Sequence, residues 1–219
     1  EKIKEKCGIL LFMSVGERSM DCCKKMYIAG ARGILSRFET SNQDIYKNIH
    51  IGQKADFKKR VKMIKDAGKI GYLIATGSLI GLPGQTKEDV LNDILLTADL
   101  NAEMYSFGPL IPHPATPLAQ NPKVNIDDIL KAIAVSRLSN PNAKILVTTA
   151  LETLNKDCRR LGLLAGANSL MINVTPEKYK GLYSIYPSKE GADKTVLESI
   201  GETLKLLYSL GRAPIDLGL

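Results

Sequence analysis

Two residues of opposite charge follow consecutive apolar segments near the start of the chain, and together they suit a zwitterionic ligand. Glu17 comes shortly after the apolar run Ile9–Ser14, and Arg37 ends the next run, Gly33–Arg37. A glutamate can bind an ammonium group, and an arginine can bind a carboxylate through two parallel hydrogen bonds. If both runs are parallel strands, the two side chains meet at one edge of the sheet. The alternative is a structural ion pair between them.

Three further groups of residues have weaker chemical signals. Thr148 and Thr149 offer adjacent hydroxyls for contacts with an anion or a carbonyl, although threonine pairs are common in strands. The segment Gly81–Gly84 lacks the spacing of a Rossmann dinucleotide site, but its backbone could hold an adenine. Tyr183 and Tyr186 are three residues apart, so they either face one cavity or pack on one helix face.

Several kinds of site are disfavoured by the sequence. Neither histidine, His50 or His113, has partners that indicate a Ser/His/Asp array. The cysteines show no zinc or cluster spacing, and they are Cys7, Cys22, Cys23 and Cys158. No lysine ends a predicted strand as a Schiff-base candidate, which disfavours a lyase or aldolase.

A proline-rich segment, Met104–Leu118, indicates a shaped loop at a strand end. Its prolines fix φ and lack an N–H donor, and they are Pro109, Pro112, Pro114 and Pro117. We therefore expect no sheet pairing beyond about Phe107. A rigid loop in this place suggests a site, and the alternative is a stiff connector.

Composition is that of an ordinary soluble globular protein. The chain has 219 residues, of which 44% are hydrophobic, and no apolar run reaches the about 20 residues that span a bilayer. With no signal or transit peptide, a cytoplasmic location without a membrane partner is expected. The net charge is +7. The basic residues are scattered apart from one helical run, which we interpret as a solvated face rather than a nucleic-acid site: Lys58, Lys59, Arg60, Lys62 and Lys65.

Apolar strands alternate with amphipathic helices along the chain. Six strands are predicted, at residues 9–14, 33–37, 72–80, 104–107, 144–149 and 169–172. The intervening helices are predicted from about 19, at 55–67, 87–100, 126–138 and 157–165, and a last helix at about 194–210. Uniformly apolar strands indicate a parallel sheet covered by helices, either doubly wound or closed into a TIM-type barrel.

Polar residues at the carboxyl ends of the predicted strands favour the barrel, because barrels place their sites there. A complete eight-stranded barrel takes about 250 residues. We therefore expect an incomplete α/β barrel of six βα units, corresponding to strands 3 to 8, in a single domain spanning residues 1–219. The first residue is Glu1 rather than methionine, so we also expect the chain to begin inside a longer gene product.

Six motifs in order resemble the HydE family of radical SAM proteins, FeFe-hydrogenase maturases that are related to biotin synthase and methylornithine synthase. The motifs are Ser14-Val-Gly-Glu-Arg, Arg37-Phe-Glu-Thr, Gly77-Ser-Leu-Ile-Gly-Leu-Pro-Gly-Gln-Thr, Gly108-Pro-Leu-Ile-Pro-His-Pro-Ala-Thr-Pro, Thr148-Thr-Ala and Met171-Ile-Asn-Val-Thr-Pro. The resemblance covers nearly the whole chain.

The resemblance implies a radical SAM barrel that cleaves S-adenosylmethionine to a 5′-deoxyadenosyl radical for hydrogenase cofactor maturation. The implied cofactor-binding residues are Ser14, Glu17, Arg37, Ile80, Gly81, Leu82 and Pro83. The implied substrate-binding residues, around a small molecule or iron complex, are Thr148, Thr149, Met171, Tyr183 and Tyr186. Other hydrogenase maturation proteins are the implied partners.

The sequence departs from the family at its clusters. The CxxxCxxC triad that holds the 4Fe–4S cluster is absent, so this chain alone is expected to be inactive while its full-length parent is an enzyme. Some members carry a second cluster on a CxxC motif, and the corresponding positions are Ser199 and Glu202. Two alternatives remain open: a non-catalytic barrel remnant that binds a small molecule or partner, and an enzyme closer to biotin synthase or methylornithine synthase.

Overall fold

The strands form one curled parallel sheet. The computed structural model describes residues 1–50, 55–180, 182 and 194–215. The strands of the sheet are β1 (Phe12–Met13), β2 (Gly33–Leu35), β3 (Leu73–Thr76), β5 (Met104–Tyr105), β7 (Lys144–Val147) and β8 (Ser169–Leu170), and they pair in that order. Every pairing is parallel. The predicted incomplete TIM-type barrel with six parallel strands is therefore confirmed.

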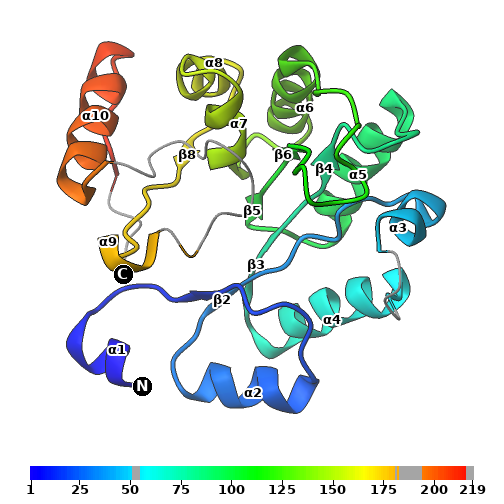
Figure 1. The fold of residues 1–219 in the computed structure, drawn as a ribbon. Coiled ribbons are helices and arrows are strands. Elements are labelled where there is room, and N and C mark those ends of the chain that lie inside the picture. The colour runs from blue at the N-terminus through cyan, green and yellow to red at the C-terminus, as the bar shows by residue number, and fades with distance from the viewer. Residues whose placement is uncertain (51–54, 181, 183–193, 216–219) are drawn as a thin grey trace.

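Helices surround the outer side of this half-barrel, and α1 and α10 lie at the two ends of the arc (Figure 1). The helices are α1 (Lys2–Lys6), α2 (Met20–Ile28), α3 (Gln43–Ile49), α4 (Phe57–Ile70), α5 (Lys87–Asp99), α6 (Ile126–Ser139), α7 (Thr149–Leu154), α8 (Cys158–Leu164), α9 (Glu177–Lys180) and α10 (Val196–Ser209). The helices cover the outer face of the sheet, and apolar side chains fill the space between the sheet and the helices. This explains why polar and apolar residues do not alternate along the strands.

Local capping chemistry sets several helix starts where the sequence predicts them. Ser19 caps α2 by accepting a hydrogen bond from the Cys22 N–H. Thr86 caps α5, and Asp89 completes a capping box by accepting from the Thr86 N–H. Thr195 and Glu198 form the same arrangement at the start of α10.

Four short helices were not predicted: α1, α3, α7 and α9. Side-chain capping explains two of them. Helix α3 follows Asn42, whose side chain accepts hydrogen bonds from the N–H groups of Asp44 and Ile45. Helix α7 begins directly after β7, because the Thr148 side chain accepts from the Leu151 N–H and ends the strand at Val147. Thr148 is thus a helix cap, and Thr149 is the first residue of a helix rather than the end of a strand.

Sheet pairing continues past Phe107, so the prediction that Pro109 ends it is wrong. The short strands β4 (Leu79–Ile80) and β6 (Gly108–Pro109) pair in parallel at the carboxyl ends of β3 and β5. The Gly108 N–H donates to Ser78 O at 3.2 Å and the Leu110 N–H to Ile80 O at 2.8 Å. In a parallel pair, alternate residues donate to a given neighbour, so the missing N–H of Pro109 leaves this pairing intact.

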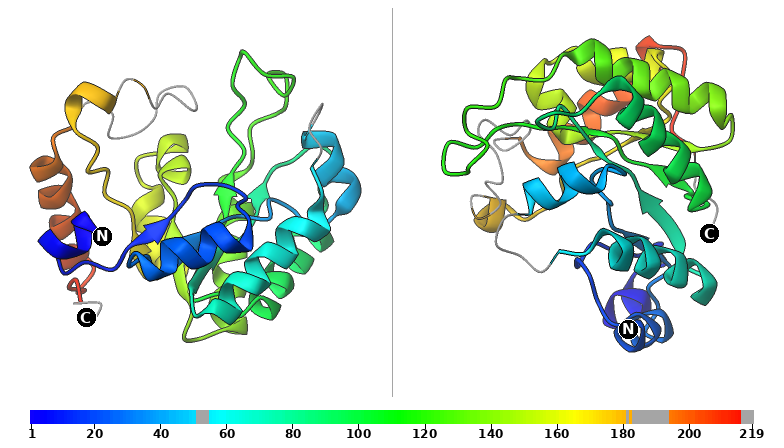
Figure 2. Two further views of the ribbon diagram at one scale, coloured as in Figure 1. Left: turned by 90° about the horizontal axis from the view of Figure 1, so that it is seen from below. Right: turned by 90° about the vertical axis from the view of Figure 1, so that its right-hand side faces the viewer.

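The loop between β6 and α6 projects from the same end of the half-barrel (Figure 2). Asn121 attaches it to the rest of that end, because its side-chain amide donates to Gly81 O at 2.9 Å. Beneath the loop the strand backbones approach closely: a Cβ on Gly77 would lie 2.3 Å from Ser106 O. The buried aromatics Phe38, Tyr105 and Phe107 fill the adjoining core. The proline-rich segment is therefore anchored at the strand end where the predicted site lies.

Candidate functional site at the carboxyl ends of the strands

Glu17 is held by an arginine that sequence reasoning did not assign to the site. Arg60 Nε on α4 lies 2.8 Å from Glu17 Oε1. Arg60 Nη1 also donates to the Arg37 carbonyl oxygen at 3.1 Å. The Arg60 side chain is 19% exposed. The interpretation of its basic run as a solvated face is therefore wrong at this position. The only hint in the sequence that Arg60 differs from its neighbours is that it is an arginine in a run of lysines.

Arg37 pairs with a residue from its own loop. Its Nε lies 3.8 Å from Glu39 Oε2. Its guanidinium also covers Gly108, because a Cβ on that glycine would lie 2.6 Å from Arg37 Nη1 and 3.8 Å from Thr148 Oγ1. Among the described residues, Glu17 thus pairs with Arg60 and Arg37 pairs with Glu39, instead of the Glu17–Arg37 pair considered above. Glu17 and Arg37 nevertheless both lie beyond the carboxyl ends of their strands, β1 and β2.

Glu39 is one of the polar residues expected at the strand ends, but it was not assigned to ligand binding, and its backbone is unusual. Its φ is +70°, a conformation that costs a non-glycine residue of order 1 kcal/mol or more. A parallel bridge to Ser78 and a hydrogen bond from the Leu79 N–H to Glu39 O at 2.8 Å hold it there. The signal in the sequence was an acid two residues after Arg37, in Arg-Phe-Glu. Strain that is held in place at a strand end is typical of a functional position.

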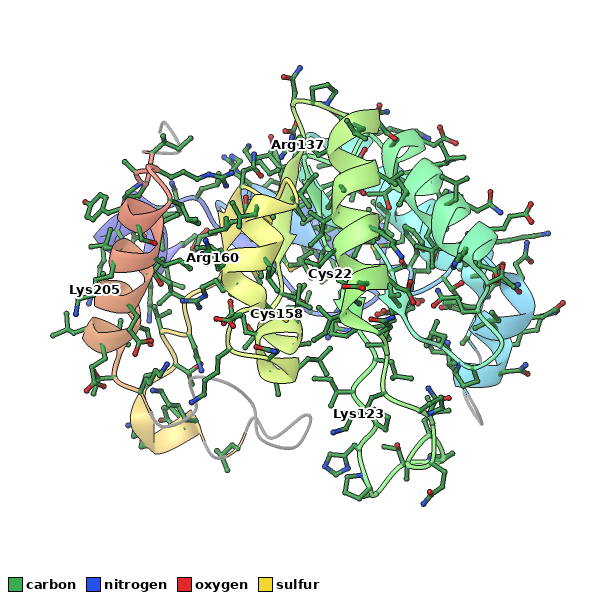
Figure 3. All side chains as sticks on the ribbon, turned by 90° about the horizontal axis from the view of Figure 1, so that it is seen from above. Cys22, Lys123, Arg137, Cys158, Arg160 and Lys205 are labelled. Atoms are coloured by element: carbon green, nitrogen blue, oxygen red, sulfur yellow. The ribbon has the colours of Figure 1, made fainter. Side chains whose placement is uncertain are left out.

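Buried polar atoms without hydrogen bonds gather at the same place. In the part of the chain that the structure describes, four buried side-chain atoms lack a hydrogen bond: Glu39 Oε2, Tyr46 Oη, Ser78 Oγ and Arg137 Nη2. The first three come from β2, α3 and β3 ends, whereas Arg137 lies on α6 (Figure 3). Such atoms are rare in folded proteins, and a ligand is one of the ordinary explanations.

Tyr46 is electrostatically part of this group. The pKa of its hydroxyl is raised, chiefly by burial. Arg60 lowers it, and Glu17, Glu39 and Asp56 raise it further, so the hydroxyl is within range of these four charges. The ring is 1% exposed and packs 4.2 Å from the ring of His50, centroid to centroid. A buried hydroxyl that makes no hydrogen bond beside charged groups is ready to bind a polar ligand.

The segment Ile80–Pro83 forms the apolar side of the site. Ile80 and Leu82 are buried, and Pro83 is exposed. Gln85 fixes the turn: its Oε1 accepts from the N–H groups of Gly81 at 2.9 Å and Leu82 at 3.3 Å. Those two amides are therefore already bonded, and the ligand contacts available from this segment are apolar atoms and carbonyl oxygens. Ser14, another predicted cofactor residue, is exposed one residue after β1.

The predicted substrate residues divide between two places. Thr148 is 8% exposed and lies on the Arg37 side, over Gly108. Thr149 Oγ1 lies 3.8 Å from Met171 Sδ, and both line a cleft of about 490 Å³. Tyr183 and Tyr186 lie outside the described residues. The structure thus brings Thr149 and Met171 together and leaves the tyrosines as predictions.

The cleft beside Met171 runs between α8 and α10. Arg160 lies on its α8 wall (Figure 3), and Ser199 and Glu202 line its α10 wall. Glu202 pairs with Lys194 at 2.7 Å. The positions that correspond to a second cluster motif therefore carry a hydroxyl and a paired carboxylate, which are poor ligands for an iron–sulfur cluster.

The described ranges contain neither a grouped set of metal ligands nor a helix that could span a membrane. There, no three His, Cys, Asp or Glu side chains are grouped so that they could hold a metal ion. All cysteines are free. None of the helices within those ranges has the length and apolar character needed to cross a bilayer.

The chain is similar in sequence to a known domain family and to maturases and biotin synthases. The Biotin and Thiamin Synthesis associated domain matches residues 106–212. The [FeFe] hydrogenase maturase subunit HydE of Thermotoga maritima is 34% identical over 96% of this chain and 60% of its own length. Biotin synthase of Neorickettsia sennetsu is 27% identical over 76% of this chain and 50% of its own. This chain thus spans half to three fifths of these relatives.

Solved structures share the fold. Methylornithine synthase (PylB) superposes with a TM-score of 0.84 at 25% identity, over 98% of this chain and 61% of that protein. The FeFe-hydrogenase maturase HydG from Carboxydothermus hydrogenoformans gives a TM-score of 0.72 at 19% identity, over 94% of this chain and 48% of that protein. With similarity to HydE along nearly its whole length and a curled parallel sheet that superposes on methylornithine synthase, this chain is a HydE-like member of the radical SAM superfamily.

Proposed function

We propose that this chain is the S-adenosylmethionine-binding part of a HydE-like enzyme of FeFe-hydrogenase cofactor maturation. One observation carries the proposal: Arg37 and Glu39 pair at the end of β2, where Glu39 Oε2 and the Tyr46 hydroxyl are buried without hydrogen bonds. The similarity to HydE supports the same function.

The residues at this end of the sheet suit the parts of S-adenosylmethionine. The Arg37 guanidinium can bind a carboxylate, and Glu17 and Glu39 can accept from an ammonium or from ribose hydroxyls. Buried Ile80 and Leu82 beside Gly81 offer an apolar surface for a flat ring. When bound to a 4Fe–4S cluster whose ligands lie outside the described residues, S-adenosylmethionine supplies radical chemistry. The chain's own residues bind it, orient it and keep water from it.

Binding is tested by titrating S-adenosylmethionine into the full-length gene product after reconstitution with iron and sulfide. We expect Arg37→Ala to weaken binding by about tenfold to a hundredfold, since a charge-assisted contact contributes about 1.5–3 kcal/mol. Arg32→Ala is the matched control, because Arg32 precedes β2 at the opposite end and donates to Tyr27 O. Equal affinities of the Arg37→Ala variant and the unaltered protein would refute the assignment.

For the substrate, we propose that Thr149 and Met171, together with Tyr183 and Tyr186, line the space that takes a small molecule or an iron complex, and that Thr148 borders this space from the Arg37 side. The Thr149–Met171 contact supports this. A bulky Thr149→Phe change is expected to block turnover while leaving S-adenosylmethionine affinity unchanged. Other hydrogenase maturation proteins remain the proposed partners.

Catalysis by the chain is tested with iron, sulfide and dithionite under anaerobic conditions, followed by chromatography for 5′-deoxyadenosine. We expect the product from the full-length protein and none from the 219-residue chain, whose cysteines lack cluster spacing. Product from the 219-residue chain would contradict this expectation. A full-length protein that binds S-adenosylmethionine without forming product would favour a non-catalytic binding function.

A further inference from the structure

Helix α5 carries a buried carboxylate that the proposed site does not use. Asp93 is 0% exposed. Its Oδ1 accepts from both the N–H and the hydroxyl of Ser41, each at 2.6 Å. Its Oδ2 accepts from Gln85 Nε2 at 3.4 Å. A buried acid is costly unless it is hydrogen-bonded, and these contacts are what retain it.

The two partners of Asp93 belong to the two loops that form the site. Ser41 stands two residues after Glu39, in the loop that follows β2. Gln85 binds the Gly81 and Leu82 amides through Oε1 and the Leu79 carbonyl through Nε2, at 2.9 Å for the last contact. Asp93 therefore connects the charged side of the site to its apolar side through one carboxylate.

A second acid on α5 strengthens the same connection. Asp89 lies one turn before Asp93, and its Oδ1 accepts from Asn42 Nδ2 at 3.0 Å. Its Oδ2 belongs to the capping box with Thr86, at 2.8 Å. The start of α5 is thus bonded to the loop after β2 at two successive residues, Ser41 and Asn42.

We propose that Asp93 is a positioning residue for the ligand site, which in its ionised form holds the Arg37–Glu39 segment and the Ile80–Pro83 segment in register. The inference rests on the proposed function, because that function is what places a ligand between these segments. Asp93 itself touches no proposed ligand atom. It acts through Ser41 and Gln85.

The protonation state of Asp93 decides whether the connection to Gln85 exists. When the carboxylate is ionised, its Oδ2 accepts a hydrogen bond from Gln85 Nε2. When Oδ2 is protonated, its O–H faces the Gln85 N–H, and two donors cannot bond to each other. Burial raises the pKa of Asp93 to about 6, and the hydrogen bonds from Ser41 oppose the rise. Asp89 is the charged neighbour that acts on it, whereas its other neighbours, Ser41, Ser78 and Gln85, are uncharged. Ser78 Oγ lies near the carboxyl without a hydrogen bond of normal geometry.

Asp93→Asn imitates the protonated form, because its Oδ1 can still accept from Ser41 while its Nδ2 faces Gln85 Nε2. In the reconstituted full-length gene product, we expect this variant to bind S-adenosylmethionine about tenfold more weakly at pH 7.5. The unaltered protein should lose affinity as the pH falls through about 6, and the variant should show no such inflection. Asp99→Asn is the matched control, since Asp99 is an exposed acid at the end of the same helix.

A second measurement does not depend on the ligand. Amide hydrogen exchange should accelerate in Asp93→Asn at Gly81 and Leu82, and also at Ser41, whose bond to Oδ1 is weakened by the loss of the negative charge. Exchange in β3 and β7 should stay unchanged. Acceleration throughout the molecule would mean that Asp93 only stabilises the fold, and it would overturn the proposal. Unchanged affinity with an unchanged pH profile would overturn it as well. If the unaltered protein bound no S-adenosylmethionine, the proposed function would fail first, and local exchange at the two loops would still decide whether Asp93 positions them.

Discussion

Arg60 Nε lies 2.8 Å from Glu17 Oε1, and this pair joins residues 43 positions apart in the chain. The same guanidinium donates to Arg37 O at 3.1 Å. Helix α4 thereby connects the loop after β1 to the loop after β2. Two predicted ligand residues are positioned by a third that the sequence did not single out.

The first prediction concerns this connection. Arg60→Ala should weaken S-adenosylmethionine binding several-fold, because Glu17 loses its partner and the Arg37 carbonyl loses its donor. Arg60→Lys should restore part of the affinity, since an ammonium cannot make both contacts in the fixed geometry of a guanidinium. Isothermal titration measures both, with the exposed Lys58→Ala on the same helix as control. If Arg60→Ala bound as well as the control, α4 would have no part in the site.

The second prediction uses the close approach at Gly108. A Cβ there would lie 2.6 Å from Arg37 Nη1, so Gly108→Ala must displace the guanidinium. We expect about a tenfold loss of ligand affinity, equivalent to about 1.4 kcal/mol. Gly201→Ala is the control, because nothing lies within 4 Å of its Cβ position and alanine favours a helix. Unchanged affinity of Gly108→Ala would show that Arg37 is not needed in its present place.

The third prediction separates backbone strain from ligand binding at Glu39. With φ at +70°, Glu39→Gly should be more stable than Glu39→Ala by about 1 kcal/mol, as judged by urea unfolding. Both variants remove the carboxylate, so both should bind S-adenosylmethionine more weakly than the unaltered protein. Equal stability of the two variants would mean that the backbone at this position relaxes at no cost.

The fourth prediction is a dependence of stability on pH. Because the pKa of Asp93 rises from 3.8 in the unfolded chain to about 6 in the fold, the native state binds more protons between those values. The associated stability is complete below the unfolded value and is lost as the pH rises through about 6, about 3 kcal/mol in total. From pH 4.5 to 7.5, the free energy of unfolding of Asp93→Asn should gain about 2 kcal/mol relative to the unaltered protein. A difference that is constant with pH would contradict the buried, titrating carboxyl.

The fifth prediction concerns the attachment of α10. Arg159 makes two bonds to Glu152, at 2.7 and 2.9 Å, and its Nη1 donates to Thr203 Oγ1 on α10 at 3.0 Å. Glu152 is 5% exposed, so Glu152→Ala leaves a largely buried guanidinium without its carboxylate. We expect a loss of about 3 kcal/mol in the free energy of unfolding. Thr203→Val removes the bond from the Arg159 guanidinium and the hydroxyl's own bond to Ser199 O, and it should cost about 1–2 kcal/mol. Equal effects of the two changes would show that the ion pair is not the main anchor.

The sequence by itself determined the order of the elements and the edge at which chemistry gathers. Uninterrupted apolar runs at β2, β3 and β7 indicate strands covered by helices, since both faces of a parallel sheet are buried. Ser19, Thr86 and Thr195 mark helix starts through local hydrogen bonds that depend on three or four neighbouring residues. The six motifs add the family, and with it the expected ligand.

Partners and conformations that depend on contacts across the chain were decided by the tertiary structure alone. The pairing of Glu17 with Arg60, the strained φ of Glu39 and the burial of Asp93 each depend on residues that meet only after the sheet curls and α4 and α5 pack against it. The pairing of β6 past Phe107 is decided in the same way. Whether the missing N–H of Pro109 interrupts a sheet depends on whether that position would donate to the neighbouring strand. Periodicity and capping report local geometry, whereas ion pairs and buried networks depend on distances between loops that the sequence does not encode in its spacing.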